Sequence, residues 1–465
     1  MEYRKNEVLE MEITDLGSEG EGIGRTGAFL WFVKDALPGD RIRASVMKVK
    51  KNYGYARLQE ILAPGPDRTA PACPVARQCG GCTLQAMGYA AQLRFKENKV
   101  RNNLLRIGGI PEERLQEVFH PIIGMEEPFR YRNKAQFPVG YTKAGIAAGF
   151  YAGRTHSIIP CEDCLLGVEE NKEITKEVLS WMEDNRVPPY DEESGSGFVR
   201  HILIRKGFQS GQIMVCLVTN GEKPQGIMTA AVERLMKLPG VVTVVQNINR
   251  ERTNVILGRD SRTLGGPGFI TDSIGGTEFE ISAQSFYQVN PVQTEKLYGT
   301  ALEYAHLTGN ETVWDLYCGI GTISLFLAKK AGKVRGVEIV PQAIEDAKRN
   351  AARNGISNAE FFVGKAEEVL PAWYAEQQRK PEEEREKIDV ICVDPPRKGC
   401  DEACLKTMLE VSPERIVYVS CDSATLARDL KYLLADGTYR LEQVQPVDMF
   451  PQTVHVECVC RVKKV

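Results

Sequence analysis

Short apolar runs alternate with helical stretches along the chain from Thr312 onward. The apolar runs at 334–338, 388–393 and 416–420 have the length of buried strands, and helical runs such as 323–328 and 424–434 accompany them. This βαβ spacing predicts a mainly parallel, doubly wound sheet. Ligands of such sheets bind beyond the carboxyl ends of the strands, so residues at those ends are the candidates for chemistry.

The N-terminal part of the chain has a different pattern, in which glycines separate short strands. Four strands are expected, at 7–16, 28–33, 41–49 and 55–61. Short strands with glycine-rich turns favour a small closed barrel of OB type. Residues 130–280 mix β-branched strands with a helix near 171–184 and predict a mixed α/β domain.

We therefore expect an α/β multidomain protein with three parts. An OB-like barrel occupies residues 1–62, a central mixed α/β domain residues 63–280, and the doubly wound domain residues 281–465. A helix over about 89–107 is expected to pack on this last, catalytic domain.

The composition is that of a globular protein, with 43% hydrophobic and 26% charged residues in 465. No apolar run is long enough to span a bilayer and the N-terminus lacks the apolar core of a signal peptide, so we expect a cytoplasmic protein. In a reducing compartment, the 13 cysteines indicate metal ligation or catalysis rather than disulfides.

The net charge of −3 does not by itself indicate a nucleic-acid-binding protein. Residues 41–57, however, carry six lysines and arginines, two tyrosines and no acidic residue. A basic segment with aromatic residues is typical of nucleic-acid binding, although a solvated strand face can have the same composition. This basic segment is the candidate contact for a nucleic acid.

Cys421 follows an apolar run and precedes a helical run, which places it between a strand end and a helix start. A helix N-terminus favours the thiolate, so this cysteine has the position of a nucleophile. A free cysteine is more often a small buried apolar residue. Its place next to a cofactor loop favours the nucleophile.

That cofactor loop runs from Asp315 through Gly319 to Gly321. Glycines at such a turn let a ligand approach the backbone closely. Glu338 closes the next strand, where an acid commonly holds ribose hydroxyls. A dinucleotide fingerprint would have a third glycine where Ser324 stands, so the loop favours a smaller adenosyl ligand over NAD.

A second strand end carries Asp394-Pro395-Pro396-Arg397. Prolines fix the chain direction and leave Asp394 at the edge of the sheet. Beside an adenosyl loop, this arrangement is how several S-adenosylmethionine enzymes address a nucleobase; the alternative is a structural turn.

Five segments together resemble the class I RNA (uracil-5-)methyltransferases, in order and spacing over the whole C-terminal half. They are 286–290 (Phe-Tyr-Gln-Val-Asn), 315–321, 394–399, 420–422 (Ser-Cys-Asp) and 450–457. The N-terminal barrel, with Gly-Glu-Gly-Ile-Gly at 20–24 and Leu-Pro-Gly-Asp at 37–40, resembles a TRAM domain. The barrel, together with the cluster of cysteines at 73, 79 and 82, makes the chain similar to the 23S ribosomal RNA branch of the family.

The resemblance implies a Rossmann-like domain that transfers a methyl group from S-adenosyl-L-methionine to C5 of a uridine in RNA. Cys421 is then the nucleophile that adds to C6, Glu457 the base that removes the C5 proton, and Asp394 the residue that orients the uracil. The residues expected to bind the cofactor are Gln288, Tyr317, Gly319, Glu338 and Asp394. The partner is RNA, most often a single-stranded or loop region of 23S rRNA, with no membrane and no protein partner implied.

The cysteines at 73, 79 and 82 form a C-x5-C-x2-C pattern that needs a fourth ligand, for which Cys161 and Cys164 are candidates. Four thiolates suit zinc or an iron–sulfur cluster. The resemblance implies a 4Fe-4S cluster held by Cys73, Cys79, Cys82 and Cys164, because the family places its last ligand before a short apolar step. Cys161 is the alternate ligand.

Four other functions share parts of this pattern. A transfer RNA uridine-5 methyltransferase shares the catalytic motifs, and an amino-methyltransferase of a base or a protein side chain shares the Pro-Pro signature but needs no nucleophile. A radical methylthiotransferase would need C-x3-C-x2-C, which the sequence lacks. A non-catalytic iron–sulfur RNA-binding module would not need both Cys421 and Glu457.

Overall fold

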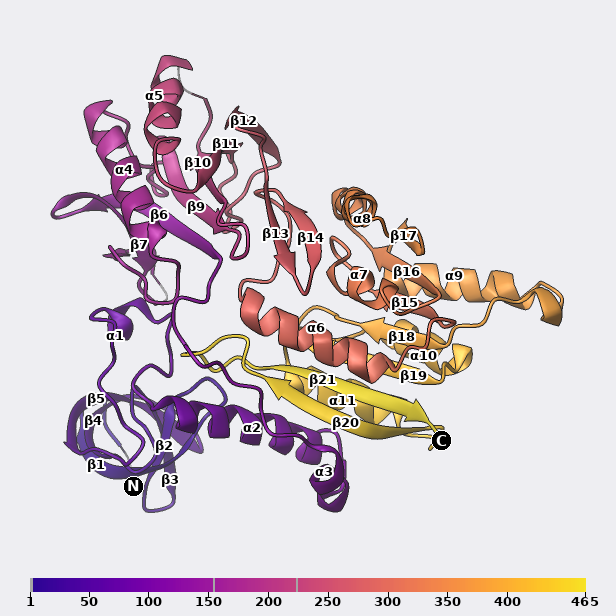
Figure 1. Ribbon diagram of the computed structural model, residues 1–465. Helices are drawn as coiled ribbons and strands as arrows, with labels where there is room; N and C mark the ends of the chain where they lie inside the picture. The colour runs from indigo at the N-terminus through magenta and orange to yellow at the C-terminus, as the bar shows by residue number, and fades with distance from the viewer. Residues whose placement is uncertain (1–2, 154, 223–224) are drawn as a thin grey trace. The chain divides into compact units, whose positions relative to one another are not determined.

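The computed structural model describes residues 3–153, 155–222 and 225–465 (Figure 1). Its internal contacts divide the chain into two compact units. The first contains the N-terminal part through Lys99, Tyr151–Ile159 and Phe450–His455, and the second contains the remainder. Three separate stretches of sequence therefore build the first unit.

Five strands of the first unit close into a barrel, in the order β1-β2-β3-β5-β4 (Figure 1). They are β1 (Val8–Leu16), β2 (Gly22–Thr26), β3 (Phe29–Lys34), β4 (Arg41–Val49) and β5 (Tyr53–Ala63). Alternate side chains such as Trp31, Val33 and Ile42 fill the interior. Gly22 is required because a Cβ there would lie 2.6 Å from the Ala36 carbonyl oxygen. The predicted closed barrel is confirmed.

Besides the barrel, the first unit includes the short helix α1 (Ala76–Cys79), the beginning of α2 (Tyr89–Arg106) and the segment 450–455. Gln92 of α2 donates from Nε2 to Oε1 of Gln452 at 2.9 Å, and Lys96 donates from Nζ to the carbonyl of Phe450 at 2.9 Å. A segment close to the C-terminus is thereby fixed to this helix.

A mixed central sheet has the order β12-β11-β10-β9-β6-β7-β8. Its strands are β6 (Lys134–Thr142), β7 (Gly145–Tyr151), β8 (Ile158–Pro160), β9 (Val199–Lys206), β10 (Ile213–Thr219), β11 (Val241–Ile248) and β12 (Asp260–Gly265). Helices α4 (Glu170–Asp184) and α5 (Gln225–Leu235) contribute Trp181 and Ala231 to the core on one face. The opposite face carries Lys134 and Arg205, which lie directly opposite each other on β6 and β9.

The third sheet has the order β17-β16-β15-β18-β19-β21-β20 and is parallel from β17 through β19. Its strands are β15 (Thr312–Leu316), β16 (Lys333–Glu338), β17 (Ala359–Val363), β18 (Val390–Val393), β19 (Arg415–Ser420), β20 (Tyr439–Val447) and β21 (Glu457–Lys464). The strand order reverses between β15 and β18, which is where ligands of such sheets bind. The predicted doubly wound sheet is confirmed, with two antiparallel strands added at one edge.

Helices cover this sheet on both faces (Figure 1). One face packs with α3 (Glu112–Val118), α9 (Ala366–Gln378), α10 (Glu402–Val411), α11 (Ser423–Leu433) and the end of α2, in a core that includes Leu104, Leu115, Leu370, Met408 and Leu430. The other helices are α6 (Pro291–Ala305), α7 (Thr322–Ala328) and α8 (Pro341–Arg353), with the hairpin β13 (Ile270–Ile274) and β14 (Thr277–Ile281) beside α8. Among the described residues, no helix is both long and apolar enough to cross a bilayer.

Candidate active site

The loop after β15 lies at the switch point of the third sheet. Asp315 at the end of β15 is buried, and its Oδ2 accepts a hydrogen bond from Ser324 Oγ at 2.5 Å. Burial, with the charge of Asp394 adding to it, raises the pKa of Asp315 to about 7. The sequence marked Ser324 only as a position where a dinucleotide fingerprint would have a glycine. In the structure its hydroxyl fixes the carboxyl group of Asp315 beneath the loop.

The loop backbone has the geometry of a ligand cradle. Tyr317, Gly319 and Gly321 have positive φ angles of 70°, 56° and 83°. A Cβ at Gly319 would meet no atom within 4 Å, so a ligand can approach the backbone there. The N–H of Gly319 donates to Oε2 of Glu338 at 3.2 Å, and Oε1 accepts from the N–H of Val340 at 2.9 Å. The predicted ribose-binding acid thus lies across the loop.

The Tyr317 side chain, in contrast, packs against the core on the other side of the loop and interacts with the Cys404 thiol electrostatically. Burial, followed by the neighbouring thiols, raises the pKa of this tyrosine. The backbone of Tyr317 lines the cofactor loop while its ring anchors that loop to α10.

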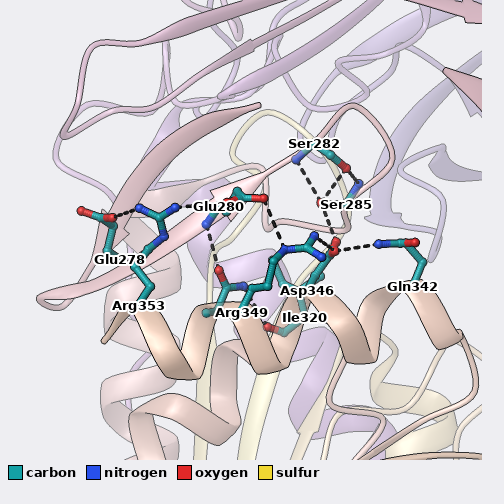
Figure 2. A network of polar contacts seen from close by, with 10 residues as sticks. Glu278, Glu280, Ser282, Ser285, Ile320, Gln342, Asp346, Arg349 and Arg353 are labelled. Carbon is teal, nitrogen blue, oxygen red and sulfur yellow. Dashed lines mark hydrogen bonds and ion pairs between the residues drawn. The ribbon is translucent and has the colours of Figure 1, made fainter. Parts of the chain in front are cut away.

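Helix α8 joins the cofactor loop to the segment that leads to Gln288, through the polar network shown in Figure 2. Asn350 donates from Nδ2 to the carbonyl of Ile320 at 3.2 Å and accepts from the N–H of Glu280 at 2.9 Å. Asp346 accepts from Ser285 Oγ at 3.2 Å. The two segments that carry the predicted cofactor residues are therefore held by one helix.

Gln288 is buried, and its backbone carbonyl accepts a hydrogen bond from Asn133 Nδ2 at 2.9 Å. Its side chain acts on Tyr298 of α6, whose hydroxyl lies 3.2 Å from Thr322 Oγ1. Burial, and next the charge of Asp394, raise the pKa of Tyr298. The sequence analysis did not predict a role for this tyrosine. The available signal was a tyrosine on the apolar face of the helix that follows 286–290.

The pairing of β19 with β21 brings Cys421 and Glu457 together. In this antiparallel register Ser420 lies opposite Cys458, so the next position on each strand brings Cys421 opposite Glu457. Cys421 is half-buried and Glu457 is only 4% exposed. Asp394 follows β18, the neighbour of β19, and contributes to the electrostatics of both groups.

The thiol of Cys421 is not activated in the free protein. Burial raises its pKa to about 12, the charges of Glu457 and Asp394 add to the rise, and Arg397 opposes it. Our prediction that the helix N-terminus favours the thiolate is therefore wrong for this state. Asp422 caps α11 instead, accepting from the N–H groups of Ala424 at 2.9 Å and Thr425 at 3.2 Å, and so satisfies the donors that would stabilise a thiolate.

The two carboxyl groups are also perturbed. Burial, together with the charge of Asp394, raises the pKa of Glu457 to about 8, and burial raises that of Asp394 to about 6. Two acids that interact electrostatically at a partly desolvated site resist double ionisation. Once ionised, Glu457 is a stronger base than an exposed carboxylate.

Comparison with known proteins identifies the family. A family profile described as tRNA (Uracil-5-)-methyltransferase matches residues 271–465, and a TRAM domain profile matches residues 3–58. An uncharacterized RNA methyltransferase of Halalkalibacterium halodurans is 52% identical over 98% of this chain and 96% of its own length, and one from Bacillus cereus is 49% identical over 99% and 97%. The chain belongs to the RNA (uracil-5-)methyltransferase family.

A solved structure has the same architecture as this methyltransferase. The Pyrococcus abyssi tRNA (uracil-54, C5)-methyltransferase in complex with S-adenosyl-L-homocysteine superimposes with a TM-score of 0.76 at 26% identity, covering 98% of this chain and 100% of the other. The methyltransferase is therefore a TRAM-containing, S-adenosylmethionine-dependent enzyme, and the predicted reaction class is confirmed.

In this methyltransferase α11 holds the loop that follows Asp394. Thr425 Oγ1 donates to the carbonyl of Arg397 at 3.1 Å, and Arg428 Nη2 donates to that of Lys398 at 2.9 Å. Asp429 is fully buried and accepts from the N–H of Cys400 at 2.8 Å. The helix that begins after Cys421 therefore also fixes the position of Arg397, whose charge acts on Cys421 and Glu457.

The TRAM barrel of the methyltransferase carries the predicted basic segment on its surface. Lys48, Lys50 and Lys51 are exposed and form no ion pair with any described residue, whereas Arg43 is paired with Glu10 and Glu60 at 2.8 and 2.6 Å. Next to Lys48 lies a cluster of aromatic rings, with centroids 5.6 to 5.8 Å apart: Phe32, Tyr53 and Tyr55. Cationic groups beside partly exposed rings suit a single-stranded nucleic acid.

The predicted metal ligands lie in two parts of the sequence. Cys73 precedes α1 and Cys79 is its last residue, and the N–H of Ala76 donates to the Cys73 carbonyl at 3.2 Å. A hydrogen bond from Cys161, the largest cause, lowers the pKa of Cys164 to about 6. No group of three or more histidine, cysteine or acidic side chains within the described residues is arranged to hold a metal ion.

Proposed function

We propose that this enzyme methylates C5 of a uridine through a covalent adduct between Cys421 and C6 of the base. The observation that carries the proposal is the β19–β21 register, in which Cys421, directly after the end of β19, lies opposite the buried Glu457. A nucleophile, a base and Asp394 then surround one point beside the cofactor loop. An amino-methyltransferase would need neither the thiol nor Glu457.

The reaction follows from this arrangement. The Cys421 thiolate forms a bond to C6, and the electrons of the C5=C6 double bond move into the carbonyl at C4 to give an enolate. C5 then takes the methyl group from the sulfonium, whose carbon–sulfur bond breaks and leaves S-adenosylhomocysteine. Glu457 accepts the C5 proton, the C6–S bond breaks, and the thiolate is released. The raised pKa of Glu457 suits a base for a weakly acidic C–H group.

The remaining predicted residues are assigned to binding the cofactor and orienting the uracil. Gln288, the backbone of Tyr317 and Gly319, and Glu338 are proposed to hold S-adenosylmethionine, with Asp394 at the boundary between cofactor and uracil. The open space at Gly319 supports this arrangement. Because C5 is reached only after the base leaves its stack, an unpaired or loop uridine is the expected target.

We propose 23S rRNA as the substrate, within an enzyme divided into a TRAM barrel (1–62), a central domain (63–280) and a catalytic domain (281–465). The combination of TRAM barrel and cysteine cluster supports this choice. A transfer RNA is the second candidate, because the Pyrococcus abyssi relative is named as a tRNA (uracil-54, C5)-methyltransferase. Mapping 5-methyluridine in both RNA classes from cells with and without the protein separates the two.

We also propose that Cys73, Cys79, Cys82 and Cys164 hold a 4Fe-4S cluster, with Cys161 as the alternate to Cys164. The C-x5-C-x2-C spacing and the lowered pKa of Cys164 support thiolate ligation. No step of methyl transfer is assigned to the cluster.

One assay tests the nucleophile and the base. RNA containing 5-fluorouridine at the target should form an adduct with the wild type that survives denaturation, because fluorine cannot leave as a proton does. Cys421→Ala should form no adduct, and Glu457→Gln should accumulate a methylated adduct even with ordinary uridine. Cys458→Ala is the control. Turnover by Cys421→Ala would show that the assignment of the nucleophile is wrong.

A further inference from the structure

Three cationic side chains gather at the start of β6. The charge of one of them, Arg132, acts on the thiol of Cys164. Lys134 lies directly opposite Arg205 in the β6–β9 pairing, so the two side chains share one face of the central sheet. Arg132 lies two residues before Lys134 and is close enough to repel it electrostatically. None of the three forms an ion pair with a described carboxylate, whereas Arg130 nearby is paired with Asp163 at 2.6 Å.

Arg205 is the buried member of the cluster, and Arg132 and Lys134 are half-buried, so an anion bound there would meet partly desolvated cations. Arg205 is only 4% exposed, and its Nε has no hydrogen-bond partner among the described residues. Lys134 is half-buried, and burial, together with repulsion from Arg205 and Arg132, lowers its pKa to about 8. Uncompensated buried charge is costly, so such a group of cations is suited to receive an anion.

The cluster is attached to the segment that carries Gln288. Arg205 Nη2 donates to the carbonyls of Ser285 at 2.5 Å and Ala283 at 3.3 Å. Asn133, between Arg132 and Lys134, donates from its backbone N–H to the Val289 carbonyl at 2.8 Å and from its side chain to that of Gln288. Ser285 in turn contacts α8 through Asp346, as Figure 2 shows. Arg132 and Lys134 thus flank Asn133 in the sequence, and Asn133 contacts the proposed cofactor-binding residue Gln288.

We propose that Arg132, Lys134 and Arg205 form a binding site for a backbone phosphate of the substrate RNA, next to the nucleotide that enters the active site. The inference rests on the proposed function, because it needs an RNA strand at Gln288. S-adenosylmethionine is a poorer match for the site, since it carries a sulfonium and an ammonium group beside its one carboxylate. A phosphodiester carries a full negative charge and no cation.

The test pairs a protein change with a matching RNA change. The RNA carries 5-fluorouridine at its target, and each neighbouring phosphate is replaced in turn by an uncharged methylphosphonate. Lys134→Gln should weaken RNA binding about ten-fold and reduce the salt slope by about 0.7, while leaving the affinity for S-adenosylmethionine unchanged. One methylphosphonate should weaken the wild type equally and have no further effect on Lys134→Gln.

Controls separate this inference from a structural role and from the proposed function. Lys237→Gln removes an exposed cation of the same unit and should bind RNA as the wild type does. Lys134→Arg should restore most of the affinity. Wild-type binding that is indifferent to every methylphosphonate, or a Lys134→Gln variant that loses only S-adenosylmethionine affinity, would overturn the inference. If the wild type forms no adduct with the RNA that carries 5-fluorouridine, the proposed function itself fails.

Discussion

Cys421 is surrounded by charges of both signs, and their balance decides its reactivity. Glu457 and Asp394 raise the pKa of the thiol, Arg397 lowers it, and burial has the largest effect. Burial and the two carboxylates therefore disfavour the thiolate in the free enzyme. A thiolate is favoured when positive charge enters the site, as it does with the sulfonium of S-adenosylmethionine.

This balance predicts that Arg397→Gln slows alkylation of Cys421, because loss of the opposing cation raises the pKa of the thiol further. The rate of labelling by iodoacetamide is measured by mass spectrometry of the peptide that contains Cys421, at several pH values. Lys398→Gln removes the adjacent exposed charge, which is not among the main causes of the raised pKa of the thiol, and serves as the control. Equal slowing in both variants would contradict a specific role for Arg397.

Glu457 predicts a pH-dependent contribution to stability. Its pKa is 4.5 ordinarily and about 8 in the fold, so the stability gained from the protonated form is complete below about pH 4.5 and is lost as the pH rises through about 8. Glu457→Gln lacks this loss, so its Tm should exceed that of the wild type increasingly over this range. Glu410→Gln, at a half-exposed site, should follow the wild type. A constant Tm difference would mean that the pKa of Glu457 is not raised.

At the scale of elements, two helices hold the segments that form the active site. Helix α8 holds the cofactor loop and the segment before Gln288, while α11 holds the loop after Asp394. Each of these helices lies next to a strand end in the sequence, so the sheet and its connections position the chemistry at the same time. The barrel is a separate element with its own exposed cations and aromatic rings.

The barrel surface gives a prediction for RNA binding. Replacing Lys48, Lys50 and Lys51 with glutamine should weaken RNA binding and reduce its salt slope, by about 0.7 for each single-strand phosphate that the variant no longer neutralises. S-adenosylmethionine affinity should stay constant, because its proposed site belongs to the third sheet. Isothermal titration at several salt concentrations measures both. An unchanged slope would mean that these lysines form only a solvated strand face.

At the scale of the whole molecule, the cysteine pattern links residues that are far apart in the sequence. Anaerobically purified enzyme should contain about four irons per chain. Cys164→Ser should lose iron, whereas Cys216→Ser, which changes a buried cysteine outside the pattern, should retain it. Iron retained in Cys164→Ser but lost in Cys161→Ser would identify Cys161 as the ligand, and stoichiometric zinc would refute the cluster.

The sequence alone was enough to predict the barrel, the doubly wound sheet and the strand ends that carry Asp315, Asp394 and Cys421. These features depend on local periodicity and on rules that hold for every parallel sheet. The reaction class was indicated by the resemblance to the class I RNA (uracil-5-)methyltransferases, which five segments, including 394–399 and the Ser-Cys-Asp triplet, carry in their order and spacing.

Only the tertiary structure decided the partners and the charge states. The strand register brought Glu457 opposite Cys421, and the cap at Asp422 with the surrounding carboxylates reversed the predicted activation of the thiol. The Arg132–Lys134–Arg205 cluster carried no pattern along the chain, and the contacts of Tyr298 emerged only in the folded protein. The physical reason is that a pKa or a site depends on distance and burial, which arise between segments far apart in the sequence.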